Sequence, residues 1–220
     1  MHIVAQYGGS EEEYSKQEKQ TDCVRPGACL LCGEVGSLIG HGYYWRKPKG
    51  MQGGGKISLK DIGTVWIKRW LCKQCHRTIS VLPDFLLAFR HYVVPVIQAV
   101  IEARWGCGRS WAAMEAECAE AGAPAGRTMQ RWCGSFGEQA SRWLGAVQAM
   151  LAQQDSSSPW LDPHGEALQA QGPAQALLGA GEHLLAWGKT RWAEAARYGR
   201  NDRVRFLGWW SSGRGLGRLV

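Results

Sequence analysis

The sequence lacks both features that would direct it to a membrane. No cationic start followed by an apolar run opens the chain, so we expect no secretory signal. The most apolar stretch, residues 85–105, is interrupted too often for a membrane span, by Arg90, His91, Pro95, Glu102 and Arg104. We therefore expect a cytoplasmic protein with no membrane partner. In that reducing compartment, eight cysteines favour metal binding over disulfides.

The sequence also lacks a recognisable catalytic arrangement. No Cys/His arrangement supports a thiol nucleophile, which needs an adjacent base to activate it. Three cysteines in the helical half match no metal template, and we expect buried thiols at Cys107, Cys118 and Cys133. The sequence therefore predicts a binding protein and not an enzyme.

Positive charge is present but unevenly distributed. The net charge is +7, yet residues 23–91 alone hold eleven basic and three acidic side chains. Residues 92–154 balance at five and five. A basic concentration favours a polyanion partner, because each neutralised phosphate releases condensed counterions. Charge alone is explained equally well by a solvated surface that keeps the protein soluble.

The sequence contains two Cys-x-x-Cys turns, here called knuckles, at Cys29–Cys32 and Cys72–Cys75. Each tight turn points both sulfurs to one side, so the pair predicts a closed tetrahedral Zn²⁺ site with four thiolate ligands. Gly33 permits the backbone conformation that such a turn often needs. The alternative is a set of disulfide-bonded or buried thiols. Three further residues are weaker candidate ligands, namely Cys23, His41 and His76.

Strand patterns surround the knuckles. Residues 38–46, 64–71 and 77–81 are rich in aromatic and β-branched residues, and a glycine-rich, cationic loop is expected over residues 51–63. Strands on either side of two knuckles predict a zinc ribbon over residues 23–84. Such a small ribbon buries little core, so bound metal would supply much of its folding free energy. Residues 1–22 show no hydrophobic face, and we expect a flexible tail there.

A helical period begins at Phe85 and predicts a helical domain over residues 85–154. Pro95 suits a first helical turn, and a helix from Trp111 to Ala121 is followed by a turn and a long amphipathic helix from about residue 126. Residues 155–165 have the composition of a linker, and residues 166–220 predict short helical pieces, broken at Gly179 and Gly181, and a basic tail. The fold class is therefore α+β.

The two helices around residue 124 suit a helix-turn-helix, whose second helix presents its first exposed side chains to the major groove. Arg can pair with guanine and Gln with adenine, so this helix start is suited to base reading. An ordinary helical hairpin is the alternative. The candidate DNA contacts, including basic residues of the ribbon, are Arg46, Lys47, Lys49, Lys56, Lys68, Arg69, Arg127, Thr128, Gln130 and Arg131.

These segments resemble a family of bacterial proteins associated with transposable elements, in which a transposase-like zinc ribbon precedes helix-turn-helix helices. The resemblance is carried by both knuckles with Gly33 and by residues 41–46, 67–71, 77–87 and 127–132. It implies one structural zinc ion and binding of double-stranded DNA. It does not extend to a strand-transfer core, whose three carboxylates need an α/β fold that this chain is too short to form. A protein-interaction adaptor, docking a partner such as a transposase, is the alternative function.

Overall fold

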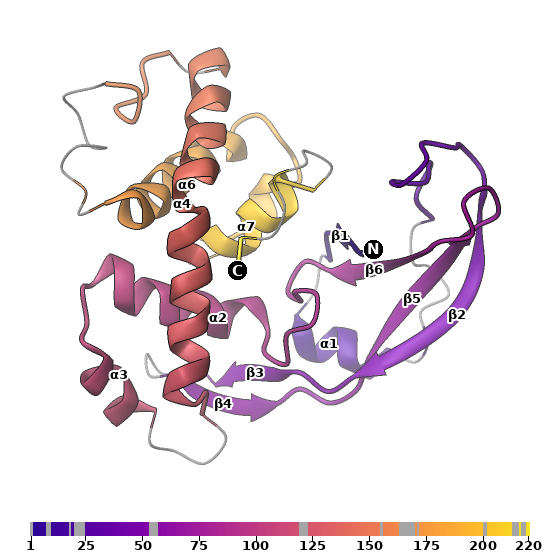
Figure 1. Ribbon diagram of the computed structural model, residues 1–220, viewed down its shortest axis with the longest axis horizontal. Helices are drawn as coiled ribbons and strands as arrows, with labels where there is room; N and C mark the ends of the chain where they lie inside the picture. Colours follow the sequence, from indigo (N-terminus) through magenta and orange to yellow (C-terminus); the bar gives the residue numbers. More distant parts are fainter. Residues whose placement is uncertain are drawn as a thin grey trace.

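The computed structural model describes residues 2–7, 10–17, 19, 25–52, 57–118, 123–154, 156–162, 170, 172–199, 202–212, 216 and 219–220. Two sequence-predicted residues, Cys23 and Lys56, lie outside these ranges. The α+β class is confirmed, with a small sheet in the N-terminal part of the chain and helices after it. In Figure 1 helices α2, α3, α4, α6 and α7 form one body, α1 lies beside the sheet, and strands β2 and β5 project as an arm.

The sheet has the order β1-β6-β5-β2. Its antiparallel part consists of β2 (Leu38–Arg46), β5 (Val65–Cys72) and β6 (Thr78–Pro83), and these strands match the sequence prediction closely. The predicted loop over residues 51–63 is wrong in part. It contributes to a separate hairpin of β3 (Lys49–Gln52) and β4 (Ser58–Asp61), whose flanking residues Ile57 and Ile62 are buried.

The expected flexible tail contains two elements, β1 (His2–Ala5) and α1 (Glu11–Lys16). Strand β1 pairs in parallel with β6. Helix α1 is stabilised by a capping box between Ser10 and Glu13. Its Tyr14 is 5% exposed, donates a hydrogen bond to the carbonyl of Trp66 at 3.2 Å, and packs edge-on against Phe85. A single buried tyrosine makes no hydrophobic stripe, which is why composition alone indicated a tail.

The helical region begins later than predicted. Pro95 does lie in the first turn of α2 (Val94–Ile101), but Phe85 and the residues up to Val93 form turns and isolated bridges. Phe85 and Leu86 are apolar because they are buried in the core, and not because they lie on a helix face. A π-helical turn, η1 (Glu102–Gly106), follows α2 without a break.

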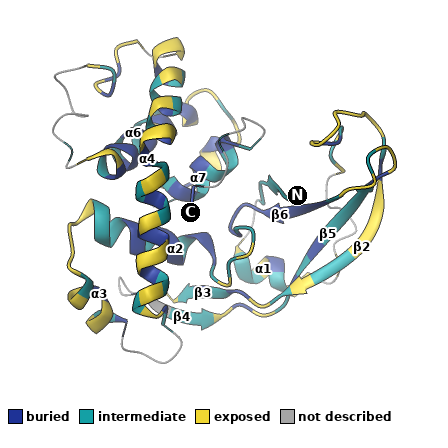
Figure 2. Ribbon diagram, viewed as in Figure 1, coloured by how far each residue is buried: buried dark blue, intermediate teal, exposed yellow. Residues whose placement is uncertain are grey.

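The helix pair is present as α3 (Trp111–Glu117) and α4 (Gly126–Gln154). The apolar positions of α4 recur at intervals of three and four residues, and its buried face consists of Met129, Trp132, Cys133, Phe136, Ala140, Trp143, Val147 and Leu151. The opposite face of α4 is exposed along its length (Figure 2). The amphipathic helix predicted from the sequence is therefore confirmed.

The C-terminal third packs against the rest of the chain. Helix α6 (Pro173–Lys189) runs through Gly179 and Gly181 without the predicted breaks. A Cβ atom at Gly179 would overlap the ring of Trp160, and one at Gly181 would lie 3.0 Å from Leu207. These glycines therefore mark close packing. Trp160 itself comes from the expected linker and is 8% exposed, so the described part of that segment is anchored to the core.

One core joins the predicted segments. It extends from Tyr14 through the sheet and helices to Val220, and it crosses the boundaries expected at residues 84 and 155. After the single turn η2 (Ala195–Arg197), helix α7 (Arg203–Trp210) buries Val204, Phe206, Leu207 and Trp210 against it. A second, small cluster lies at the knuckles and contains Cys29, Leu38, Cys72 and Ile79.

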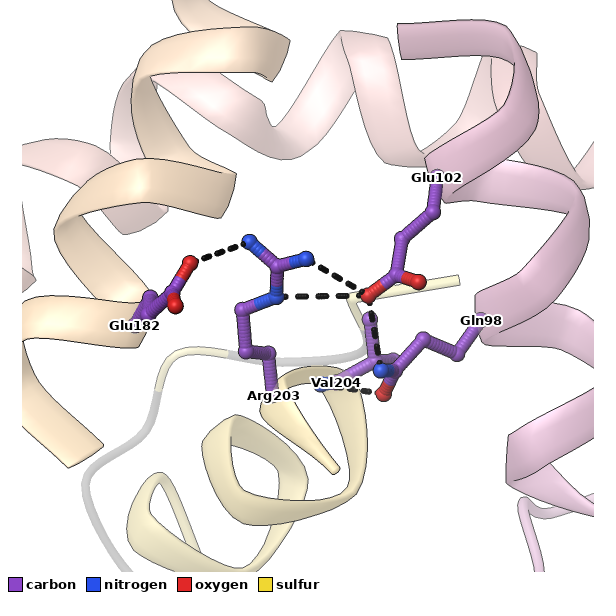
Figure 3. A network of polar contacts seen from close by, with 5 residues as sticks. All are labelled: Gln98, Glu102, Glu182, Arg203 and Val204. Atoms are coloured by element: carbon purple, nitrogen blue, oxygen red, sulfur yellow. Dashed lines mark hydrogen bonds and ion pairs between the residues drawn. The ribbon is translucent and has the colours of Figure 1, made fainter. Parts of the chain in front are cut away.

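A polar network fixes the start of α7 (Figure 3). The Arg203 guanidinium donates to Glu102 of η1 and to Glu182 of α6. Gln98, which is 2% exposed, donates to Glu102 and accepts a 2.8 Å hydrogen bond from the backbone N–H of Val204. That N–H belongs to the first turn of α7 and has no partner within its own helix. The network therefore ties four helical elements together, namely α2, η1, α6 and α7.

The N-terminal helix can be tested by substitution. We expect Tyr14→Ala to lower the free energy of unfolding by about 3–5 kcal/mol, because it leaves a cavity beside Phe85. Tyr14→Phe should cost only about 0.5–1.5 kcal/mol, for one hydrogen bond. Urea unfolding measures both, with Lys16→Ala on the exposed side as control. A Tyr14→Ala protein as stable as the control would show that α1 does not pack on the sheet.

The α7 network predicts a second effect. Gln98→Leu keeps most of the side-chain volume but leaves the Val204 N–H buried without its acceptor, at a cost of about 1–3 kcal/mol. Gln139→Leu on α4, where the side chain is partly exposed, should change stability by about 0.5 kcal/mol or less. Urea unfolding compares the two variants. Equal stabilities would contradict the network's role in anchoring α7.

Candidate metal centre and nucleic-acid interface

The four knuckle cysteines converge on one point. The sulfurs of Cys29 and Cys75 are 3.7 Å apart, as are those of Cys32 and Cys72, and all four lie within 4.8 Å of one another. A tetrahedral ion with Zn–S bonds of about 2.3 Å separates its sulfurs by about 3.8 Å. The four cysteines therefore form a possible metal site whose geometry is compatible with zinc.

The two knuckles share one backbone design. In the first, the N–H of Gly33 donates to the Cys29 carbonyl at 2.8 Å, and in the second the N–H of His76 donates to the Cys72 carbonyl at 3.0 Å. The residue after each second cysteine has a positive φ, 75° at Gly33 and 55° at His76. The sequence prediction for Gly33 is confirmed. His76 adopts the same left-handed conformation at a steric cost that glycine avoids.

Hydrogen bonds within the knuckles favour the thiolate form of two cysteines. The Ser37 hydroxyl lies 3.1 Å from the Cys72 sulfur, and its hydrogen bond, followed by one from the Cys75 backbone, lowers the pKa of Cys72 to about 6. Backbone hydrogen bonds from Cys32 and Leu31 lower the pKa of Cys29. Burial and the neighbouring sulfurs raise the pKa of Cys32 and Cys75. Metal binding requires deprotonated sulfur, so these donors favour two of the four thiolates that a cation needs.

The other candidate ligands do not join the cluster. His41 and His76 are exposed, and among the described residues only the four knuckle cysteines form a metal-type group. Of the cysteines predicted to be buried thiols, Cys118 and Cys133 are buried, whereas Cys107 is exposed. Cys107 comes directly after Gly106, the last residue of η1. It therefore lies beyond the helix and not on the buried helix face, which is why its thiol is exposed.

The site lies at the outer end of the arm (Figure 1). We call residues 28–37 and 72–77 the knuckle tip. Several apolar side chains in and beside the tip face solvent, with exposed fractions of 44% for Leu30, 49% for Leu31, 76% for Val35 and 38% for Ile39. The sequence analysis did not predict this apolar surface. Leu30 and Leu31 were a usable signal, because they stand between two candidate ligands in a turn that is too small to bury them.

Among the basic residues proposed from the ribbon sequence, some are already engaged within the protein. The Arg46 guanidinium donates to the carbonyl of Leu87 at 3.0 Å. Lys49 forms an ion pair with Asp61 at 2.7 Å. The ammonium of Lys68 lies 4.2 Å from the ring centroid of Tyr43, as a cation–π contact. Arg69 is half-buried, and Lys47 is exposed beside the Trp45 ring. Lys47 is thus the ribbon residue best presented to a polyanion.

The start of α4 presents the predicted base-reading residues to solvent. Arg127, Gln130 and Arg131 are exposed and Thr128 is partly exposed, whereas Trp132 is 2% exposed. The division between outward polar residues and an inward tryptophan agrees with the sequence analysis. Figure 2 shows the exposed stripe along this helix.

The β3–β4 hairpin lies beside the start of α4. Lys49 exchanges backbone hydrogen bonds with His91 and Val93, at 2.8 and 3.0 Å. Between those two residues, the Tyr92 ring packs edge-on against Trp132 of α4, with centroids 5.0 Å apart. Basic residues of the hairpin region and of α4, predicted separately from the sequence, therefore belong to neighbouring parts of the structure (Figure 1).

One acidic residue at this place was missed by the sequence analysis. The exposed carboxylate of Glu115 in α3 lies against Gly126, so closely that a Cβ atom there would overlap it. An acidic group is favourable near the N-terminus of a helix because it complements the helix dipole. It would also repel a phosphate approaching the same end of α4.

The comparisons with known proteins reveal one family. Residues 29–132 match the model of a domain of unknown function, DUF6431, which starts at the first knuckle and ends in the second turn of α4. The chain is therefore similar to this family over both knuckles, the sheet strands β2 to β6 and helices α2 and α3. No curated protein and no solved structure matches the chain.

None of the described helices is both long enough and apolar enough to cross a bilayer.

Proposed function

We propose that this protein binds double-stranded DNA and that a structural Zn²⁺ ion at Cys29, Cys32, Cys72 and Cys75 holds its knuckle tip together. The observation that supports the metal most directly is the convergence of four sulfurs with the spacing of a tetrahedral thiolate site. A site with four protein ligands leaves no open position for substrate, so its role is structural. We propose a binding function and no catalytic one.

The proposed DNA surface combines the start of α4 with the neighbouring hairpin. Arg127, Gln130 and Arg131 are exposed on one helix end, as expected of side chains that reach base edges in the major groove. Lys47 and Lys49 would contact phosphates next to them. Phosphate contacts set position and affinity, and base contacts supply sequence preference. The resemblance to transposase-like proteins suggests element ends as targets.

A protein-interaction adaptor remains the second candidate, and one observation favours it. The knuckle tip exposes Leu30, Leu31 and Val35 to solvent at 44%, 49% and 76%. Clustered apolar side chains on a surface are typical of protein-binding sites. A partner such as a transposase could dock there while α4 remains available to DNA, so the two functions are compatible in one chain.

The metal proposal predicts about one zinc ion per chain in protein purified without chelator or added zinc. Cys72→Ser should abolish the zinc and expose the knuckle tip to proteolysis, while helical circular dichroism persists because the main core is a separate cluster. Cys107→Ser, at an exposed cysteine outside the site, is the matched control and should retain zinc. Full zinc content in Cys72→Ser would exclude the proposed ligand set.

The DNA proposal predicts that Arg127→Ala or Arg131→Ala weakens specific binding by about 1–3 kcal/mol and relaxes the sequence preference. Arg142→Ala, further along the exposed side of the same helix, is the charge-matched control. Anisotropy titrations against a selected duplex measure the effect. Lys47→Ala should weaken the binding of all duplex sequences alike and reduce the dependence of the binding constant on salt concentration. Lys49→Ala should have a smaller effect, because the Lys49 ammonium is already paired with Asp61.

Two results of the same titration contradict the proposal. Unchanged sequence preference in both arginine variants would remove the assignment of α4 as the reading helix. Duplex affinity that is absent, or that hardly changes with salt, would leave the adaptor as the better account.

Glu115→Gln supplies an independent check, since removing a carboxylate beside Gly126 should tighten duplex binding if phosphates approach that end of α4.

A further inference from the structure

A second candidate site lies away from both the knuckles and the start of α4. A cavity of about 450 Å³ opens between β1 and the C-terminal elements, and its lining residues are Val4, Trp192, Glu194, Trp209, Trp210 and Ser212. Its volume falls within the usual range of ligand pockets, about 300–1,000 Å³. Three of its six lining residues are tryptophans, so the cavity offers flat aromatic surfaces to a ligand.

The tryptophans are held from behind by other aromatic rings. Trp192 stacks on Phe206 with centroids 6.5 Å apart and planes at 27°, and Trp209 lies 6.0 Å from the same ring. Phe206 is fully buried, and Tyr198 behind it is 2% exposed. Trp192 and Trp209 therefore both pack on one buried ring, that of Phe206. A ligand that stacks on them pays little ordering entropy, which is the condition for tight binding by a preformed site.

Gly188 packs closely against the ring of Trp192. A Cβ atom at Gly188, at the end of α6, would lie 2.8 Å from Trp192 Cε3. Trp187 meets the same indole edge-on at 5.0 Å. The position of Trp192 is thus fixed on two sides by neighbouring residues, while its side chain remains only partly buried.

The charges around the cavity determine what kind of ligand fits. Aromatic cages lined by a carboxylate can hold organic cations. Here, however, Glu194 is the one charged residue among those that line the cavity, and the exposed Lys189, Arg191 and Arg197 lie within three residues of Trp192 or Glu194 along the chain. None of these three cations has an ion pair with another residue that the structure describes. The surplus of positive charge disfavours a cationic ligand and favours one that carries phosphate.

We propose that this cavity binds an unpaired nucleobase of single-stranded nucleic acid. Trp192 and Trp209 supply the stacking surface, and Arg191 and Arg197 supply cations for the adjoining phosphates. Glu194 and Ser212 lie at the cavity wall as hydrogen-bond partners for a base edge. An aromatic platform within a basic surface is the general design of sites for single strands, and each stacked base contributes about 1–3 kcal/mol. This inference does not depend on duplex binding by α4.

The test is a titration of fluorescein-labelled single-stranded oligonucleotides with the full chain. Trp192→Leu should weaken binding about 5- to 150-fold, the range equivalent to one stacked base. Trp192→Phe should retain much of the affinity, because it keeps an aromatic face. Trp45→Leu, at a tryptophan that is 58% exposed on β2 and outside the cavity, is the control. Circular dichroism and urea unfolding show whether each variant is folded.

Four results separate the proposal from its alternatives. Loss of single-strand affinity in folded Trp192→Leu, with duplex affinity unchanged, supports the cavity. Competition by a mononucleotide at similar concentration would identify the free nucleotide, and not the strand, as the ligand. Equal single-strand affinities for wild type and folded Trp192→Leu would overturn the proposal. Arg127→Ala should show the opposite pattern, weakening duplex binding alone, so failure of one site leaves the other testable.

Discussion

The arrangement of the β-arm depends on holding four sulfurs about 3.7 Å apart at its outer end. Among the described residues, the buried cluster there consists of Cys29, Leu38, Cys72 and Ile79, with Ile3, Trp70 and Cys75 partly buried against it. So small a cluster offsets little of the entropy lost in ordering two turns, so we expect a cross-link between the knuckles. In the function proposed above, a metal ion provides that cross-link. The Ser37 hydroxyl beside Cys72 and the backbone donors beside Cys29 lower the pKa of these two thiols, which favours the charged sulfurs that a metal ion needs.

Closing the tip also fixes the strands that lead into it. Strand β2 begins at Leu38, directly after the first knuckle, and β5 ends at Cys72, the first cysteine of the second. Leu38 and Cys72 are paired in register. The same strands carry Tyr44 and Ile67 towards the main core. Lys49, the first residue of β3, is hydrogen-bonded to the segment His91–Val93, whose Tyr92 packs on α4. The metal site therefore lies at the outer end of the four-stranded sheet, and the exposed start of α4 lies beside the separate β3–β4 hairpin.

Elements with a strong local signal were predictable from the sequence. Strands β2, β5 and β6, Pro95 at the start of α2, and the buried stripe of α4 each follow from a period or from the chemistry of one residue. The four converging cysteines followed from spacing alone. The amphipathic pattern of α4 also predicted correctly that Trp132 points inward and Arg131 outward.

The failures have a common physical cause, which is that long-range packing gives no local signal. Tyr14 is buried because Phe85 and Trp66 lie against it, and α6 passes through Gly179 because Trp160 occupies the space of a side chain. Phe85 and Leu86 were interpreted as helical because apolar runs do not distinguish a helix from a buried turn. The aromatic cavity is the same kind of feature, since Val4 and Trp209 come from opposite ends of the chain.

The central claim is that one zinc ion with four sulfur ligands organises the knuckle tip. X-ray absorption spectroscopy at the zinc edge, on protein as purified, tests it most directly. The account predicts a shell of four sulfurs at about 2.3 Å with no nitrogen or oxygen scatterer. A mixed shell with imidazole nitrogen at about 2.0 Å, or the absence of zinc from folded protein, would contradict it.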